Sequence, residues 1–385
     1  MSRAPGWRDR AATDLVRKHL PYLDVEGPVL VMEDPNADEV AGAFGELLGA
    51  PGAGAVAVDP VAADPFDALD LPGPPAGGSV PVGAWHRRAR DGRPASPWPP
   101  ASPFRDGPFR TALLRLPRAR DELEMASHAA AQRLAPGGRL LVYGAKDEGA
   151  GSAAGRLEPL FEAPRSVATG GRCRLVEATR PQAVPGLRAG LEAWRIVTGP
   201  PHPDVGAERW VSYPGVFAAG RLDEGTALLL GCLDGVVGRG GENARVLDFG
   251  CGDGVVAGVL CGRTPGLAPV MLDVDTVALA AAAENVPAGV PVAGDGLGSV
   301  GEIPPFDAVV SNPPYHRGKD ETVGIVRGLI RDARRRLAAE GSLTLVVQRR
   351  LPVETAMAAA FESVEVVADG GAFRVWRGTG PSGDG

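Results

Sequence analysis

Two segments far apart in the chain follow the same order of helix, glycine turn and strand. The first reads RLAPGGRLLVYG over residues 133–144, and the second reads RLAAEGSLTLVV over residues 336–347. Strands that alternate with helices pack as a mostly parallel sheet covered by helices on both faces. The pattern therefore predicts an α/β protein, and its recurrence favours two related units in tandem. Because this order is common in α/β proteins, it does not by itself prove a duplication.

The surrounding sequence supplies the other elements of both units. Short apolar runs predict strands over 28–32, 111–116, 139–143, 306–310 and 342–347. Helical patterns cover 37–48, 121–134 and 323–338. Residues 71–108 are rich in proline and glycine, carry a basic patch at 85–90, and predict a long loop. A Pro-rich stretch at 198–203 suggests a domain boundary, with domains over 1–200 and 201–385.

Composition limits the class of protein. A chain of 385 residues with 44% apolar and 23% charged residues is long and apolar enough for two globular domains. The net charge of −7 argues against a protein that coats nucleic acid non-specifically. The first 200 residues are balanced, so the acidic excess lies in the second half. RNA binding is therefore expected of the first half.

Targeting and metal-binding patterns are missing from the sequence. The four cysteines form no CxxC pair or Cys/His cluster, so we expect neither a metal nor a disulfide framework. The first 20 residues contain several charges and no apolar core, and no apolar run approaches 18 residues. We expect a cytoplasmic protein without a membrane-spanning segment.

A glycine-rich turn after a strand is the sharpest motif. An apolar strand ends at Asp248, and Gly250, Gly252 and Gly254 precede a helix. Glycines there let the backbone turn tightly and approach a ligand at the helix start. The spacing is GxGxG, not the GxGxxG of a dinucleotide fingerprint. It is similar to motif I of class I S-adenosylmethionine (SAM) methyltransferases; the alternative is a Gly-rich turn in some other Rossmann-like protein.

Two later strands also end in aspartates. Asp273 stands where a carboxylate accepts hydrogen bonds from both ribose hydroxyls of a nucleoside cofactor. Asp275 is a near alternative, but we expect it to cap the following helix. Asp295 is placed to contact the adenine amino group, although exposed loop aspartates are common.

The next strand runs into Asn312, Pro313, Pro314 and Tyr315. This pattern suits an exocyclic amine on an aromatic ring, whose lone pair is delocalised and weakly nucleophilic. The side-chain oxygen of Asn312 and the carbonyl of Pro313 can each accept one N–H, which turns the lone pair toward the SAM methyl group. The prolines stiffen the loop, and Tyr315 can stack on the base.

The neighbourhood of these motifs resembles one family. The segments VSNPPYHRG (310–318), RRLP (349–352) and GGAFRVWRG (370–378), together with residues 113–152 and 213–230, resemble the ribosomal RNA guanine-N2 methyltransferases of the RsmC/RlmG family. The resemblance spans most of the chain.

The resemblance implies two tandem Rossmann-like class I methyltransferase domains. Residues 1–200 would be a degenerate copy that binds RNA, since no GxGxG follows its first strand, and residues 201–385 would be catalytic. It implies a SAM-dependent enzyme that methylates the N2 amine of a guanine in ribosomal RNA, with 16S RNA expected. The partner would be ribosomal RNA or a ribosomal subunit, and we expect a monomer. The residues implied for SAM and for the target base are Asp248, Gly250, Gly252, Gly254, Asp273, Asn312, Pro313, Pro314 and Tyr315.

Some residues depart from the family pattern. Tyr315 replaces the usual Phe, and Gln348-Arg349-Arg350 replaces Asn-Ala-aromatic. The roles of His316, Arg349 and Arg350 stay open, as a grip on phosphate and a solvated edge are equally compatible with the two arginines. Methylation of adenine N6 or of a glutamine amide uses the same Asn-Pro-Pro-Tyr geometry. A non-catalytic RNA-binding scaffold is a further alternative.

Overall fold

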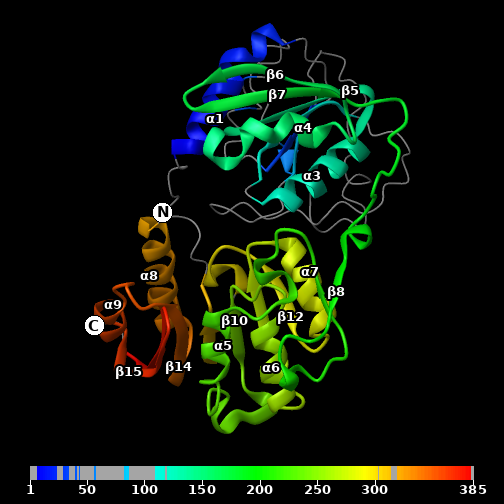
Figure 1. Ribbon diagram of the computed structural model, residues 1–385. Coiled ribbons are helices and arrows are strands. Elements are labelled where there is room, and N and C mark those ends of the chain that lie inside the picture. Colours follow the sequence, from blue (N-terminus) through cyan, green and yellow to red (C-terminus); the bar gives the residue numbers. More distant parts are fainter. Residues whose placement is uncertain are drawn as a thin grey trace. The chain divides into compact units, whose positions relative to one another are not determined.

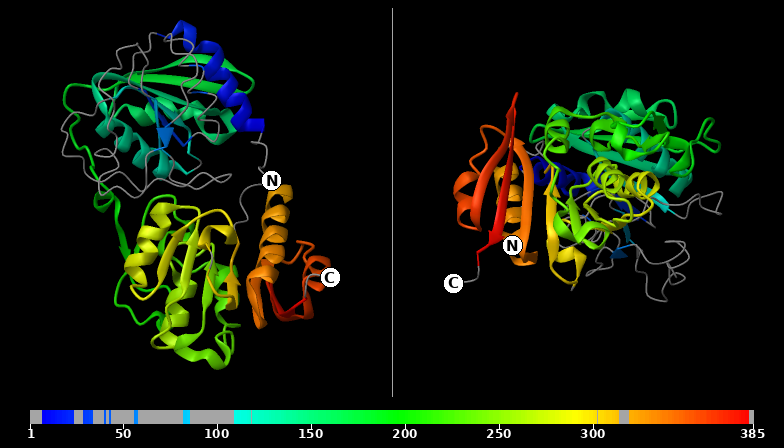
Figure 2. Two further views of the ribbon diagram at one scale, coloured as in Figure 1. Left: turned by 180° about the vertical axis from the view of Figure 1, so that it is seen from behind. Right: turned by 90° about the horizontal axis from the view of Figure 1, so that it is seen from below.

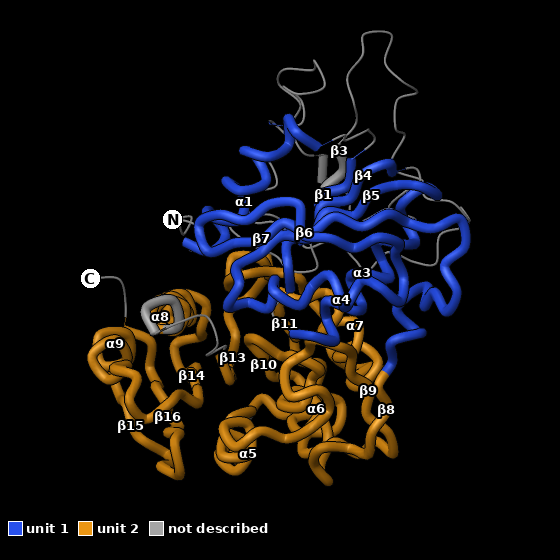
Figure 3. The backbone as a smooth tube through the Cα atoms, turned by 45° about the horizontal axis from the view of Figure 1, so that its top comes forward, with its two compact units in different colours: residues 1–195 blue, residues 196–385 orange. Residues whose placement is uncertain are grey.

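The chain folds into two compact units, Met1–Arg195 and Ile196–Gly385 (Figure 3). The computed structural model describes residues 7–23, 29–33, 40, 43, 56–57, 82–85, 109–117, 119–301, 303–313 and 319–382. The division falls slightly before the Pro-rich stretch, because strand β8 (Ile196–Thr198) pairs with β9 (Trp210–Ser212) and so belongs to the second unit. Each unit is described below by itself.

The first unit alternates strands and helices. Its strands are β1 (Val29–Met32), β2 (Val56–Ala57), β3 (Val82–Trp85), β4 (Phe109–Arg115), β5 (Leu134–Ala145), β6 (Glu162–Gly170) and β7 (Cys173–Thr179). Its α-helices are α1 (Trp7–His19), α3 (Arg120–Arg133) and α4 (Ala153–Leu157). Short 3₁₀ turns cover Leu20–Tyr22, Lys146–Glu148, Ala150–Ser152 and Glu192–Trp194.

The second unit has the same alternation after its entry hairpin. Its main strands are β10 (Val246–Phe249), β11 (Val270–Asp273), β12 (Val290–Ala293), β13 (Phe306–Ser311), β14 (Leu337–Gln348), β15 (Phe361–Gly370) and β16 (Phe373–Pro381). Its α-helices are α5 (Glu224–Leu230), α6 (Val255–Arg263), α7 (Thr276–Asn285), α8 (Lys319–Arg336) and α9 (Glu354–Ala358). Its 3₁₀ turns are Pro203–Val205, Phe217–Gly220, Gly238–Asn243 and Leu297–Val300.

Each unit is built on a seven-stranded sheet (Figure 1). The strand orders are β2-β3-β1-β4-β5-β7-β6 and β12-β11-β10-β13-β14-β16-β15. The pairs are parallel up to β5 and β14, and the final hairpin of each sheet is antiparallel. The two sheets differ beyond β1 and β10, at the edge opposite the hairpin. Moving outward, β1 is followed by β3 and then β2, whereas β10 is followed by β11 and then β12.

Helices cover both faces of each sheet, because successive strand residues point to opposite faces. In β1, Val29 and Val31 pack with α1, whereas Leu30 and Met32 pack with α3 and α4. In the second unit, β10 likewise sends Val246 toward α6 and α7 and other residues toward α8 and α9. Figure 2 shows the orange α8 beside the red C-terminal strands. Both strands are therefore buried on two sides, which confirms the expected α/β class of three-layer units.

The predicted helices and strands of the two repeated segments are confirmed, with β4, α3 and β5 in the first unit and β13, α8 and β14 in the second. The separate glycine turns expected at 135–138 and 339–341 are not, because these residues are the first part of β5 and β14. The expectation of a continuous loop over 71–108 is wrong, because β3 lies within it and pairs with both β1 and β2. Its apolar strand residues are too short a run to stand out in a Gly- and Pro-rich sequence. The rest of the basic patch, residues 86–90, and most of the helix expected over 37–48 lie outside the described residues. In the described part of the chain no helix is long and apolar enough to cross a membrane.

Candidate active site

The predicted site residues gather at one edge of the second sheet. Strands β12, β11, β10 and β13 are adjacent and parallel, so their carboxyl ends meet at the same edge. Asp248, Asp273 and Asn312 stand at or just after three of these ends, and Asp295 follows the fourth. The edge therefore brings together side chains from four separate parts of the sequence.

The three glycines form a tight turn between β10 and α6. Gly250, Gly252 and Gly254 have φ angles of 73°, 57° and 91°, a region that side-chain-bearing residues rarely adopt. The amide of Gly250 donates to the carbonyl of Leu272 at 2.7 Å. At Gly254 a Cβ would also lie 3.1 Å from Cγ2 of Val286. Glycine is thus required by conformation at all three positions and by close packing at the last.

The side chain of Asp248 stabilises this turn through a hydrogen bond to α6. Its side chain is 1% exposed, and its Oδ2 accepts a hydrogen bond from the amide of Ala257 in the first turn of α6 at 3.1 Å. Burial raises the pKa of Asp248 to about 7. The carboxyl group therefore joins the end of β10 to the start of α6, and this contact fixes the path of the glycine turn.

Asp273 is held by two backbone amides. Its Oδ2 accepts from Gly252 and its Oδ1 accepts from Asp275, each at 2.9 Å. Asp275 itself accepts from Val277 and Ala278, which confirms the expected helix cap. A carboxylate offers about four acceptor sites, so Asp273 can accept more hydrogen bonds than these two. Asp295 lies exposed just beyond β12.

Asn312 lies beside the glycine turn. The preceding residue, Ser311, pairs with Phe249 and donates from its hydroxyl to the Phe249 carbonyl at 2.7 Å. A Cβ on Gly250 would lie 3.8 Å from the backbone oxygen of Asn312. The two strongest sequence motifs therefore lie next to each other.

The side chain of Asn312 has one occupied end and one open end. Its Nδ2 donates to Oγ1 of Thr226 at 2.8 Å and approaches Oδ2 of Asp223 at 3.4 Å. Its Oδ1 is buried, and no described residue donates a hydrogen bond to it. A buried acceptor without a donor costs about 1–3 kcal/mol. This oxygen is thus ready to accept an N–H from a bound ligand.

The remainder of the Asn-Pro-Pro-Tyr motif is only partly visible. Pro313 is buried next to Asn312. Pro314, Tyr315 and His316 lie outside the described residues. Their predicted roles therefore stay predictions.

Sequence reasoning missed Asp223 and Thr226, although it singled out the segment that contains them. Asp223 precedes α5 and accepts from the amides of Gly225 and Thr226 at 3.0 and 3.3 Å. This capping arrangement is readable from an aspartate three residues before a threonine at a helix start. The contact with Asn312 is not, because it joins residues that are 86 positions apart.

Asp253 and Asn285 were also missed. Asp253 is 5% exposed, accepts from the amide of Gly220 at 3.2 Å, and has a pKa raised to about 6 by burial. Asn285 on α7 donates to the carbonyls of Val211 and Asp253 at 2.7 and 2.9 Å. These bonds join the glycine turn to the segment that leads into α5.

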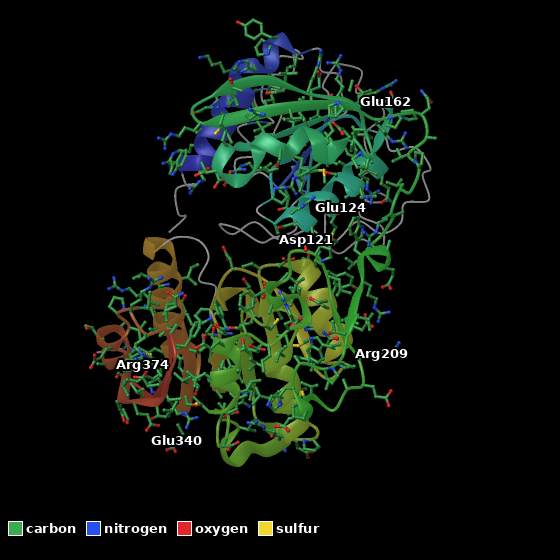
Figure 4. The ribbon with its side chains drawn as sticks, in the orientation of Figure 1. Asp121, Glu124, Glu162, Arg209, Glu340 and Arg374 are labelled. Atoms are coloured by element: carbon green, nitrogen blue, oxygen red, sulfur yellow. The ribbon has the colours of Figure 1, made fainter. Side chains whose placement is uncertain are left out.

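The two arginines after β14 differ in their partners. Arg349 forms an ion pair with Asp369 at 2.5 Å, and Asp369 also pairs with Arg374 on β16 at 2.6 Å. Arg374 is labelled in Figure 4. The hydrogen bond from Arg374 is the main reason that the pKa of Asp369 lies below its usual value. Arg350 is exposed and donates to Gln348 at 3.1 Å. Arg349 and Arg374 thus share one carboxylate. Arg350 is exposed, so its guanidinium can reach a phosphate.

Among the described residues, the corresponding sheet edge of the first unit differs from this site at two matched positions. Thr111 pairs with Arg139 and Ala308 pairs with Ser342, at equivalent places in the two repeated segments. Counting the same number of residues onward matches Arg115 with Asn312. The side chain of Arg115 is buried and ion-paired with Asp9 and Glu148 at 3.0 and 2.8 Å.

The glycine turn has a counterpart as well. Val29 pairs with Thr111 as Val246 pairs with Ala308, which matches Glu33 with Gly250. Glu33 has a φ of 59°, so the left-handed backbone is kept while a carboxylate side chain replaces the glycine.

Family models match both units. The model of the methyltransferase small domain covers residues 208–377, and the model of its N-terminal domain covers residues 101–191. The N-terminal model lies within the compact unit Met1–Arg195, and the methyltransferase small-domain model lies within Ile196–Gly385.

Curated relatives extend over most of the chain. Ribosomal RNA small subunit methyltransferase C of Pseudomonas entomophila is 35% identical over 279 residues, which are 70% of this chain and 79% of the relative. The protein of the same name from Hahella chejuensis is 33% identical over 276 residues, 70% of this chain and 78% of the relative.

A solved structure has the same fold over nearly the whole chain. It is the T. thermophilus 16S rRNA N2 G1207 methyltransferase (RsmC) in complex with AdoMet and guanosine, with a TM-score of 0.70 and 22% identity over 98% of this chain and 94% of that one. Because identity is low, this match shows a shared fold. The curated relatives, which are 33–35% identical over 70% of this chain, show that it belongs to the RsmC/RlmG family of ribosomal RNA methyltransferases.

Proposed function

We propose that the second unit transfers a methyl group from SAM to the exocyclic N2 amine of a guanine in ribosomal RNA, with 16S RNA as the substrate. The curated relatives carry the name ribosomal RNA small subunit methyltransferase C. The solved protein of the same fold is named as an N2 methyltransferase of 16S RNA. We assign this activity to the cytoplasm, where ribosomal RNA is assembled into ribosomal subunits.

The sheet edge fits SAM. The glycine turn lets backbone approach the ligand, and the start of α6 offers amide N–H groups to the carboxylate of its methionine part. Asp273 is held in place by two amides and can accept hydrogen bonds from the ribose hydroxyls. Asp295 is exposed at the end of the next strand and is assigned to the adenine amino group. When bound, SAM supplies an electrophilic methyl group.

The open Oδ1 of Asn312 is the observation that carries the proposal. An aromatic amine has two N–H groups, and Oδ1 of Asn312 can accept one of them. The backbone carbonyl of Pro313 is assigned to the other. With both N–H bonds directed to acceptors, the nitrogen lone pair points toward the glycine turn, which lies next to Asn312. The methylated nitrogen then loses a proton, so this chain needs no strong general base.

The first unit is proposed to bind RNA without performing chemistry. Glu33 at the place of Gly250 would put a carboxylate where the negative end of SAM must lie. Arg115 at the place of Asn312 donates hydrogen bonds and accepts none. The balanced charge of the first 200 residues, against the acidic second half, favours RNA contact there.

Product analysis tests the proposal. The protein and SAM are incubated with naked ribosomal RNA and with small subunits from a strain that lacks the gene, and the RNA is digested to nucleosides. We expect one new N2-methylguanosine. Formation of N6-methyladenosine instead, or of methylglutamine in a release factor tested in parallel, would show that the target is not guanine but the corresponding alternative. Asn312→Ala serves as the inactive control.

A further inference from the structure

We propose that Asp223 and Thr226 are positioning residues that fix which end of the Asn312 carboxamide faces the target amine. The inference rests on the proposed function insofar as Asn312 captures an amine, and it extends that function to Thr226 on α5 and to Asp223, which caps this helix. Neither residue needs to touch the target. Both would act through Asn312.

The three side chains form a connected chain of hydrogen bonds. Nδ2 of Asn312 donates to Oγ1 of Thr226 at 2.8 Å. The hydroxyl of Thr226 donates to Oδ2 of Asp223. Oδ1 of Asp223 accepts from the amides of Gly225 and Thr226. This series of hydrogen bonds therefore runs from the cap of α5 to the side-chain amide of Asn312.

The hydrogen bonds of this chain can run in only one direction. An ionised carboxylate only accepts, so the single hydroxyl proton of Thr226 is directed to Asp223. The oxygen of Thr226 then presents lone pairs to Asn312, and only the NH₂ end of the carboxamide can pair with them. A flipped carboxamide would place its oxygen against Thr226 and lose this bond. Oδ1 is thereby left for the target amine.

The arrangement is held before any substrate arrives. Thr226 is 8% exposed, and Asp223 is fixed by the two amides at the start of α5. A Cβ on Gly225 would lie 3.2 Å from the ring of Phe373, so the first turn of α5 packs closely against β16. A polar group that is already oriented does not have to reorganise during the reaction.

Helix capping alone does not account for this geometry. Capping explains why Asp223 accepts from the amides of Gly225 and Thr226. It gives no reason for the Thr226 hydroxyl to bridge Asp223 and Asn312. Nor does it explain why the opposite end of the same carboxamide stays buried without a donor from any described residue.

The test compares Thr226→Val, which removes only the hydroxyl, with Thr226→Ser, which keeps it. Thr344→Val is the matched control, because Thr344 is also buried but lies on β14 and accepts from Arg377. We expect Thr226→Val to lower kcat by about 10- to 100-fold, with KM for RNA and the Kd for SAM within about twofold of wild type. Thr226→Ser and Thr344→Val should stay near wild-type activity.

A double-mutant cycle identifies the route of the effect. If Thr226 acts through Asn312, Thr226→Val should add no further loss to Asn312→Ala. Equal losses in both backgrounds, a tenfold weaker SAM affinity in Thr226→Val, or full activity of Thr226→Val would each overturn the inference. Should Thr226→Val not fold, Asp223→Asn retains a capping side chain and is expected to lower kcat in the same way. Rates are measured on whichever amine the wild type methylates, so an error in the proposed guanine substrate is seen separately.

Discussion

Arg115 takes the strand position in the first unit that Asn312 takes in the second. The side chain of Arg115 is buried and ion-paired with Asp9 and Glu148. Asn312 instead leaves a buried acceptor without a donor from the described residues. The two sheet edges therefore differ at matched positions: one holds a buried ion-pair cluster, and the other holds a buried acceptor that a ligand can use.

This divergence predicts a single SAM site per chain. Isothermal titration calorimetry of the full chain should give a stoichiometry of one, because Glu33 and Arg115 occupy the positions of Gly250 and Asn312. Asp273→Ala should weaken that one site without revealing another. A second bound SAM would refute the assignment of the first unit as a degenerate copy.

Asp273→Ala should weaken SAM binding by about 10- to 150-fold. The variant removes the carboxylate assigned to the ribose hydroxyls, and hydrogen bonds to charged groups contribute roughly 1.5–3 kcal/mol. Calorimetry measures the change in Kd. Asp234→Ala is the control, since Asp234 is 91% exposed and pairs only weakly with Arg263 at 3.4 Å. An unchanged Kd in Asp273→Ala would place the ribose elsewhere.

Asn312→Ala should separate binding from chemistry. We expect the Kd for SAM to stay within about twofold, while methyl transfer falls by about 10²- to 10³-fold, the scale for losing one polar group that acts in the transition state. Single-turnover rates with radiolabelled SAM measure the loss. If the variant lost SAM affinity but kept its rate at saturation, Asn312 would belong to the cofactor site.

Asp248→Asn should change the pH dependence of stability. Burial raises the pKa of Asp248 to about 7, whereas a carboxyl in an unfolded chain titrates near 3.9. Between about pH 4 and 7 the carboxyl is therefore protonated in the folded state but ionised in the unfolded state. The stability that this group contributes is fully present below about pH 4 and is lost as the pH rises to about 7.

The asparagine has no such titration. Urea unfolding at a series of pH values should thus show the free energy of unfolding of Asp248→Asn gaining on the wild type between about pH 4 and 7, and then running parallel to it. Asp295→Asn, at an exposed position, serves as the control. A difference between Asp248→Asn and wild type that is independent of pH would contradict the burial argument.

The sequence by itself determined the main elements and placed each motif at the end of a strand. Apolar runs and glycine turns are local signals, and they correctly predicted β13, α8 and the strand part of β14. Once β10, β11 and β13 are known to be parallel neighbours, their carboxyl ends must lie together, so Asp248, Asp273 and Asn312 had to converge. The cap at Asp275 was equally readable, because its hydrogen bonds stay within the first turn of α7.

Only the tertiary structure decided which side chains meet across that edge. The bond between Thr226 and Asn312 joins residues 86 positions apart, and it depends on how α5 packs against β14 and β16. The match of Arg115 with Asn312 likewise required the register of β4 against β5 and of β13 against β14. The spacing of apolar residues reflects the backbone geometry of a single helix or strand, so it can be recognised in the sequence. A contact between side chains of different elements depends on the packing of the whole unit, so only the structure reveals it.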